Sequence, residues 1–191
     1  MGFFWNRRDR DGRASRQKRH QRHLEFTILE DRQVPTIVTV TAVAFPRALE
    51  PANGRFLPVV VSGTVKQSLT QVLAGNVTSL PPAELAALQA KLAAEPTPGR
   101  ALAQVTDRYR RVEPRVRAPL HQIGSTNIFA PASKTNPTAV VGVVRDFTYT
   151  LTVFLQAKNG KFGPPRQYDI NVSAGDQNGG AGTTIGVGVP R

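Results

Sequence analysis

The clearest pattern in the chain is a strict alternation of apolar and polar positions in its C-terminal half. Every odd position of residues 147–155 is aromatic or aliphatic, and Thr148, Thr150 and Thr152 lie between them. Because successive side chains of a β-strand point to opposite faces, this alternation predicts a strand with one buried and one solvated face. The same spacing recurs in residues 167–174 and at Ile185, Val187 and Val189, which predicts two more strands.

The segment between these last two strands is rich in turn-forming residues. It reads Gly-Asp-Gln-Asn-Gly-Gly over residues 175–180, which favours a hairpin connection. The oxygen donors Asp176 and Asn178 superficially resemble part of a calcium loop, but the later bidentate Glu that such a loop requires is absent. A hairpin turn is therefore favoured, and no metal site is expected.

Four weaker strands are predicted in the first two thirds of the chain. They cover residues 37–45, 57–65, 101–107 and 112–120, with proline and Asn-Gly breaks between the first two. Together with the C-terminal strands they make seven, all short and without an alternating strand–helix pattern. This arrangement predicts an all-β, antiparallel sandwich.

One amphipathic helix is expected at about residues 82–94, between the second and third strands. Leu85, Leu88 and Leu92 would share one face of it. Ser79 can act as its N-cap, and Glu84 favours the positive end of the helix dipole. We expect this helix to pack over the edge or the end of the sandwich.

The N-terminal part of the chain has a different character. Residues 1–23 are rich in arginine and have almost no apolar periodicity, so they cannot bury enough surface to offset the entropy of ordering. We expect residues 1–35 to be a disordered basic arm or a removed export segment, and residues 36–191 to be the folded domain. The run of residues 37–45 suits either a short signal-type apolar region or a first strand. Nothing reaches the length of a membrane span.

Composition limits the available chemistry. The chain has no cysteine, which excludes thiolate catalysis and cysteine-ligated metal, and the carboxylates are scattered with no spacing that enforces a shared site. No serine lies in a nucleophile elbow. We therefore expect no enzyme activity, no catalytic residues and no cofactor.

The net charge of +12 and the excess of 25 Lys and Arg over 13 Asp and Glu permit attraction to polyanions. The charge is spread along the chain, and its densest part in the folded region is an arginine cluster. The cluster consists of Arg108, Arg110, Arg111, Arg115 and Arg117. Residues two apart on a strand share a face, so Arg115 and Arg117 would line up and could contact phosphates, sulfates or acidic sugars. A solvated hairpin whose arginines discourage edge-to-edge pairing is the favoured interpretation.

Two parts of the sequence resemble known proteins. Residues 29–35, Leu-Glu-Asp-Arg-Gln-Val-Pro, follow an arginine-rich arm and resemble the LEDR-x-V/L-P segment of many extracellular planctomycete proteins. That resemblance implies export or a cell-surface location, with a mature domain that begins near residue 36.

Much of residues 37–190 is similar to bacterial immunoglobulin-like repeats. The similarity rests on the segment Pro46 to Val59, on the run Val-Thr-Asp-Arg-Tyr at 105–109, and on the hairpin segment 168–179. It implies a seven-stranded immunoglobulin-like sandwich with one inserted helix. Glu50 and Arg110 depart from the usual Trp and Gly, and without cysteine the antibody-type disulfide is excluded. Tyr168 would be either a corner tyrosine or a plain core residue.

These observations favour a non-catalytic, secreted or cell-surface immunoglobulin-like module with a structural, adhesive or interaction role. Its partner would be a surface protein or a polysaccharide. The alternative is a basic protein that binds nucleic acid or acidic polysaccharide through the arm and the arginine cluster, and nucleic acid is the less favoured ligand.

Overall fold

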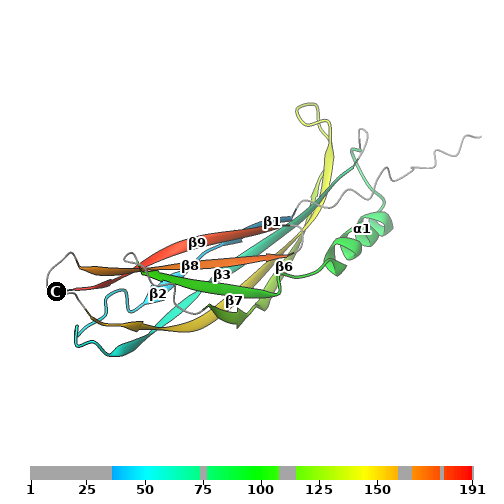
Figure 1. The fold of residues 1–191 in the computed structure, drawn as a ribbon. Helices are drawn as coiled ribbons and strands as arrows, with labels where there is room; N and C mark the ends of the chain where they lie inside the picture. The colour runs from blue at the N-terminus through cyan, green and yellow to red at the C-terminus, as the bar shows by residue number, and fades with distance from the viewer. Residues whose placement is uncertain (1–35, 74–76, 108–114, 159–164, 177–178, 191) are drawn as a thin grey trace, which may run out of the picture. The chain divides into compact units, whose positions relative to one another are not determined.

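The computed structural model describes residues 36–73, 77–107, 115–158, 165–176 and 179–190 (Figure 1). All of them belong to one compact unit, Arg32–Arg191, and the chain divides from its first unit after Asp31. The expected basic arm, residues 1–35, lies outside the described residues.

The described residues are mostly β and form nine strands and one helix. In chain order these are β1 (Thr36–Val40), β2 (Val43–Phe45), β3 (Phe56–Leu73), α1 (Pro82–Ala94), β4 (Arg100–Asp107), β5 (Val116–Pro119), β6 (His121–Ala130), β7 (Ala139–Gln156), β8 (Arg166–Asp176) and β9 (Gly179–Val189).

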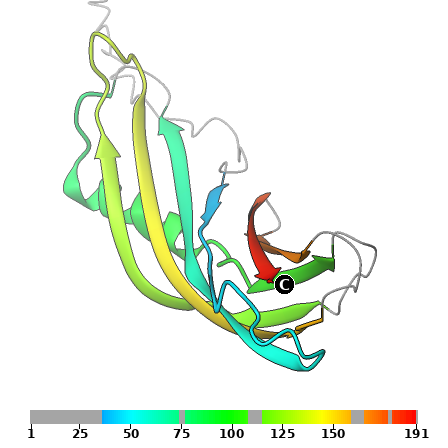
Figure 2. The ribbon, with the colours of Figure 1, turned by 90° about the vertical axis from the view of Figure 1, so that its left-hand side faces the viewer.

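The larger sheet has five antiparallel strands in the order β1-β3-β7-β6, with β2 also paired to β3. Its centre is the pair of β3 and β7, two strands of 18 residues each. Their pairing runs without a shift from Phe56 opposite Gln156 to Leu73 opposite Ala139. Figure 2 shows this pair, which we call the long ribbon, as two curved strands in cyan and yellow.

The smaller sheet has four antiparallel strands in the order β5-β4-β8-β9. β8 and β9 pair from Arg166 opposite Val189 to Asp176 opposite Gly179, which confirms the predicted hairpin. The consecutive strands β3 and β4 therefore lie in different sheets, with α1 between them in the chain.

The two sheets share one apolar core. Its members on the long ribbon occupy odd positions such as Val61 and Leu151, and they pack with Val105, Ile170 and Val187 of the smaller sheet. The predicted alternation in residues 147–155 is confirmed, because all five odd positions are at most 5% exposed. Strand period therefore decides which side chains fill this core.

A second core lies farther along the same face of the long ribbon. Leu69, Val141 and Val143 again occupy odd positions, and here they pack against Leu92 of α1. Five partly buried side chains complete this core: Leu73, Leu80, Leu85 and Leu88, and Phe129 of β6. One face of the ribbon thus meets the smaller sheet at one end and the helix at the other.

The helix has the predicted range, and Leu85, Leu88 and Leu92 share its buried side, as expected. The expectation that Ser79 caps it is wrong. The N-cap is Pro81, without a side-chain hydrogen bond, and Pro82 begins the helix. Because proline has no backbone N–H, a proline in the first turn leaves one donor fewer to satisfy.

A close approach between the segment after β1 and the neighbouring strands interrupts the first predicted strand. The hydroxyl of Tyr149 donates a 2.7 Å hydrogen bond to the carbonyl of Thr41. Both groups lie where a Cβ at position 63 would stand, so Gly63 is required there. The Thr41 hydroxyl accepts from the backbone N–H of Thr64 at 3.0 Å, and this local exchange separates β1 from β2.

After β2 the chain passes from the larger sheet to the smaller one. Ala48 forms a parallel bridge with Gly188 of β9. The backbone N–H of Leu49 donates to the Gly188 carbonyl at 2.9 Å, and the Gly188 N–H donates to the Arg47 carbonyl at 3.0 Å. Leu49 is fully buried. This segment therefore connects the two sheets at one edge by backbone hydrogen bonds.

The count of seven strands is wrong for the described residues, which contain nine. One predicted strand is split into β1 and β2, and β6 was not predicted at all. Most side chains of β6 are exposed on both faces, and its pairing shifts between Gln122 and Gly124, so it shows no alternation that a sequence pattern could reveal.

Candidate functional site

The structure places two members of the predicted arginine cluster. Arg117 lies on β5, an edge strand of the smaller sheet, and Arg115 is the residue directly before the start of this strand. Both are exposed, whereas Ala118 is buried, so the two guanidinium groups lie on the solvent side of this edge. Arg108, Arg110 and Arg111 lie outside the described residues.

A third exposed arginine joins them from the neighbouring strand. Leu102 of β4 pairs with Arg117, and Arg100 lies two positions before Leu102 on the same face. Residues directly opposite each other on an antiparallel pair share a face. Sequence reasoning missed Arg100 because no local spacing shows which strand will pair with β5.

Two of the described carboxylates, Asp107 and Asp146, form ion pairs. Asp107 accepts two hydrogen bonds from Arg166, at 2.9 Å to Nε and 2.6 Å to Nη2. The Arg166 guanidinium also lies 4.7 Å from the ring centre of Tyr168. Asp146 pairs with Lys66 at 3.7 Å on the surface.

The described residues contain no cluster of metal-ligating side chains. Among the residues that the structure describes, no three His, Asp or Glu side chains gather closely enough to hold a metal ion. Glu113 and the side chain of Asp176 lie outside that set.

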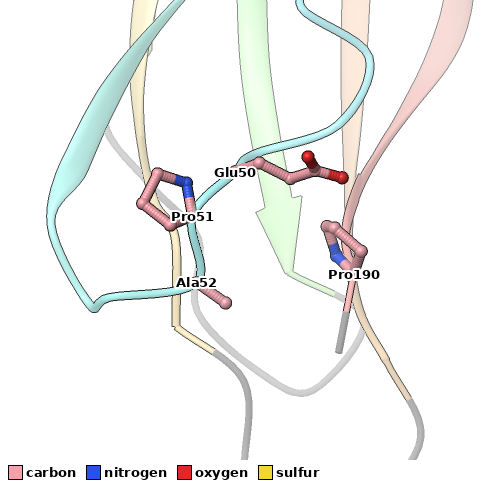
Figure 3. Close-up of a pocket in the computed structure, with 4 residues that line it drawn as sticks. All are labelled: Glu50, Pro51, Ala52 and Pro190. Carbon is pink, nitrogen blue, oxygen red and sulfur yellow. The ribbon is translucent and has the colours of Figure 1, made fainter.

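An open cavity of about 640 Å³ lies where the sheet-crossing segment meets the end of the chain. Glu50, Pro51, Ala52 and Pro190 line it, and Figure 3 shows the Glu50 side chain extending toward Pro190. Among the described lining residues Glu50 is the one ionisable side chain, and a carboxylate among apolar rings can attract a cation or an amine.

Tyr168 is a buried residue that connects the two sheets. It lies near the start of β8 with its ring fully buried, and its hydroxyl donates a 2.9 Å hydrogen bond to the carbonyl of Gln156 at the end of β7. The side chain thus ties the start of one strand in the smaller sheet to the end of a strand in the larger sheet.

The most buried charge in the described chain is Arg145 on β7, which is 3% exposed. Its guanidinium donates to the carbonyls of Leu92, Ala93 and Glu95 at the end of α1, with distances of 3.2 Å to Leu92 and 2.9 Å to Glu95. Gln67, opposite it on β3, donates to the Pro96 carbonyl at 3.0 Å. Leu92 and Ala93 lie in the last turn of the helix, whose carbonyls lack intrahelical partners, although the Leu92 carbonyl also accepts from the Glu95 backbone N–H at 3.2 Å.

Burial lowers the pKa of Arg145, and the nearby Glu95 carboxylate partly offsets that effect. An arginine nevertheless stays protonated in proteins, so the charge persists. The sequence analysis did not single out Arg145. Its position between Val143 and Phe147, in step with inward-facing residues, is the signal that could have identified it.

Comparisons with protein-family models, with curated proteins and with solved structures found no match to this chain. None of the helices in the described part of the chain has the length and apolar character needed to cross a membrane.

Proposed function

We propose that this chain is a non-catalytic, secreted or cell-surface immunoglobulin-like module with a structural, adhesive or interaction role. The observation that carries the proposal is the strand order. An immunoglobulin constant-type domain has strands A, B, E and D in one sheet and C, F and G in the other. The order β1-β3-β7-β6 corresponds to A-B-E-D. The order β5-β4-β8-β9 corresponds to C′-C-F-G, where C′ is an additional strand next to C of the kind found in variable-type domains.

The crossing segment adds support for this assignment. Residues 46–49 leave the larger sheet and bridge β9 in parallel, so the first strand of the domain contributes to both sheets. The Tyr168 hydroxyl bond to Gln156 also matches the corner between strands E and F in such domains. These contacts join the sheets in a chain that has no cysteine for an inter-sheet disulfide.

The non-catalytic role is supported by the positions of the polar groups. Asp107 and Asp146 are held in ion pairs, and the described lining of the cavity beside Pro190 contributes one carboxylate, that of Glu50. A self-contained apolar core with a solvated surface is what a structural or interaction module needs.

The secreted or surface location rests on the resemblance of residues 29–35 to an export-associated segment. Its test is fractionation of the producing cells, with protease added to intact cells and with a cytoplasmic protein as control. The proposal expects the domain in the medium or cleaved at the surface, with an intact mass that lacks about the first 35 residues. A full-length protein that begins at Met1 and remains protected with the cytoplasmic control would contradict it.

A second candidate function is polyanion binding, which the exposed group Arg100, Arg115 and Arg117 favours. Electrostatic binding to duplex DNA weakens with salt by a slope of about 0.9 per phosphate contact. The double variant Arg115→Ser, Arg117→Ser should therefore flatten the salt dependence of binding to duplex DNA or to an anionic polysaccharide. Lys134→Ser with Lys158→Ser removes the same charge elsewhere and is the matched control. Equal binding by both double variants would refute a role for this edge.

A further inference from the structure

The outer face of the larger sheet carries a group of exposed apolar side chains, which we call the outer patch. It consists of Val43 and Phe45 on β2, Phe56 and Val60 on β3, and Phe154 on β7. These side chains are 52%, 77%, 60%, 41% and 62% exposed, respectively. Three neighbouring strands therefore present large apolar groups to solvent on the side away from both cores.

The register of the sheet makes the patch continuous. Phe45 is directly opposite Val60, and Phe154 is directly opposite Pro58. Phe56 and Val60 lie two positions on either side of Pro58, so each is a diagonal neighbour of Phe154. Opposite and diagonal neighbours on one face are within reach of aromatic side chains.

The patch has the size of the largest apolar patch on a typical monomeric protein, which is often functional. A phenylalanine has roughly 150–250 Å² of surface to bury, so the exposed parts of the three rings amount to about 400 Å². The two valines bring the patch to roughly 500 Å², which is within the range of about 300–600 Å² where the largest patch of a monomer is often functional.

The centre of the patch carries no charged side chain, and the charges near it lie at its ends, where the exposed Arg47, Arg55 and Lys158 flank one end. The residues between its apolar side chains on this face include the exposed Ser62, Thr150 and Thr152. Toward α1 the next charges are Lys66 and Asp146, which pair with each other at 3.7 Å. The centre of the patch therefore neither attracts an acidic partner nor makes two identical copies repel each other. Depletion of charge is also typical of the centre of a protein interface.

We propose that two copies of this chain associate through the outer patch as a two-fold symmetric dimer, with their larger sheets packed face to face. A two-fold interface uses the same surface on both subunits, so it needs a face that is complementary to itself. The two patches alone would bury about 1,000 Å², and the surrounding hydroxyl-bearing rows bring the contact to the lower end of stable interfaces, about 1,200 Å². The dimer is therefore reversible. The inference does not depend on where the protein is located or on what else it binds.

Sedimentation equilibrium of the full chain over a range of concentrations tests this proposal. The expected result is a monomer–dimer equilibrium without larger oligomers. It should persist when the salt concentration is raised, because apolar contact does not rely on charge. The double variant Phe45→Ser, Phe154→Ser should weaken it at least about tenfold, the effect of losing about 1.4 kcal/mol at an interface.

The control is Val72→Ser with Ile123→Ser, which removes two apolar side chains that are 61% and 64% exposed outside the patch. This variant should dimerise like the unaltered chain, and far-UV circular dichroism should show all three proteins folded. A chain that stays monomeric, that grows into open-ended oligomers, or that associates equally well in both double variants would overturn the proposal.

Discussion

The two ends of the long ribbon have the same alternation of inward and outward side chains, but different elements pack against their inward faces. At the end of Val59, Val61 and Leu151 the inward face packs against the smaller sheet, and the core is apolar. At the end of Leu69 and Val141 the same face packs against α1, and two buried polar residues accompany the apolar ones.

The difference follows from what each cover needs. The smaller sheet satisfies its backbone groups by its own pairing, so it can present only apolar side chains to the ribbon. A helix end leaves carbonyl groups without partners, and burying them without a donor is costly. Arg145 provides donors to the helix end from the sheet, and Gln67 donates to the Pro96 carbonyl just after it. The helix-covered end therefore depends on specific hydrogen bonds where the sheet-covered end depends on packing.

The largest effect is expected from a charge in the sheet-covered end. Val172 is fully buried, and Val172→Asp would place an unpaired carboxylate in the core and should prevent folding. Asn171 is exposed, and its Oδ1 accepts a 2.6 Å hydrogen bond from Thr184. Asn171→Asp keeps that acceptor and should be nearly silent. Denaturant unfolding of both variants is the test, and equal tolerance would contradict the two-faced assignment of β8.

The helix-covered end is broken most selectively by Arg145→Met. The change keeps the apolar part of the side chain but removes the donor to the Glu95 carbonyl and one of the two donors to the Leu92 carbonyl, which keeps the Glu95 backbone N–H. We expect a loss of about 2–4 kcal/mol in the free energy of unfolding, since hydrogen bonds to charged groups are worth roughly 1.5–3 kcal/mol each.

Lys66→Met is the matched control for that variant. Lys66 lies next to Gln67, and its side chain is 59% exposed in a surface ion pair with Asp146. Its loss should cost no more than about 1 kcal/mol. Amide hydrogen exchange should speed up in α1 for Arg145→Met and not for Lys66→Met. Similar losses in both variants would show that Arg145 does not act as the anchor of the helix.

Alkaline pH tests the sheet-covered end through Tyr149. Burial raises the pKa of this phenol from its ordinary value near 10 to about 12. The folded protein therefore holds the proton more tightly than the unfolded chain, so the contribution to stability is complete below pH 10 and is lost as the pH rises toward 12. The free energy of unfolding, measured across this range, should fall more steeply with pH for the unaltered chain than for Tyr149→Phe. Parallel curves would refute the burial of this hydroxyl.

A smaller effect is expected where the two sheets meet at Tyr168. Tyr168→Phe keeps the buried ring and removes the 2.9 Å hydrogen bond to the Gln156 carbonyl. The expected loss is about 0.5–1.5 kcal/mol, the ordinary net value of one hydrogen bond. Thermal unfolding of this variant would distinguish a corner tyrosine from a ring that serves only in packing, since the latter predicts no change.

Sequence patterns predicted the parts of this fold where period and face coincide. The alternation in residues 147–155, the final hairpin and the helix were all evident because their side chains divide cleanly between core and solvent. β6 was missed because both of its faces are largely exposed. Arg145 was missed because a charge in an apolar run is explained only by the helix end that lies over it. The neighbours of Arg100 likewise depend on strand pairing, which spacing along the chain does not reveal.

The strand order is the central claim, and solution NMR of backbone contacts between strands tests it most directly. Neighbouring strands lie about 4.8 Å apart, close enough for strong cross-strand signals. The account predicts signals that join β3 to β7, for example Val61 to Leu151, and β4 to β8, for example Val105 to Ile170. It predicts no ladder between β3 and β4, which follow each other in the chain but lie in different sheets. A continuous β3–β4 ladder would contradict the two-sheet arrangement.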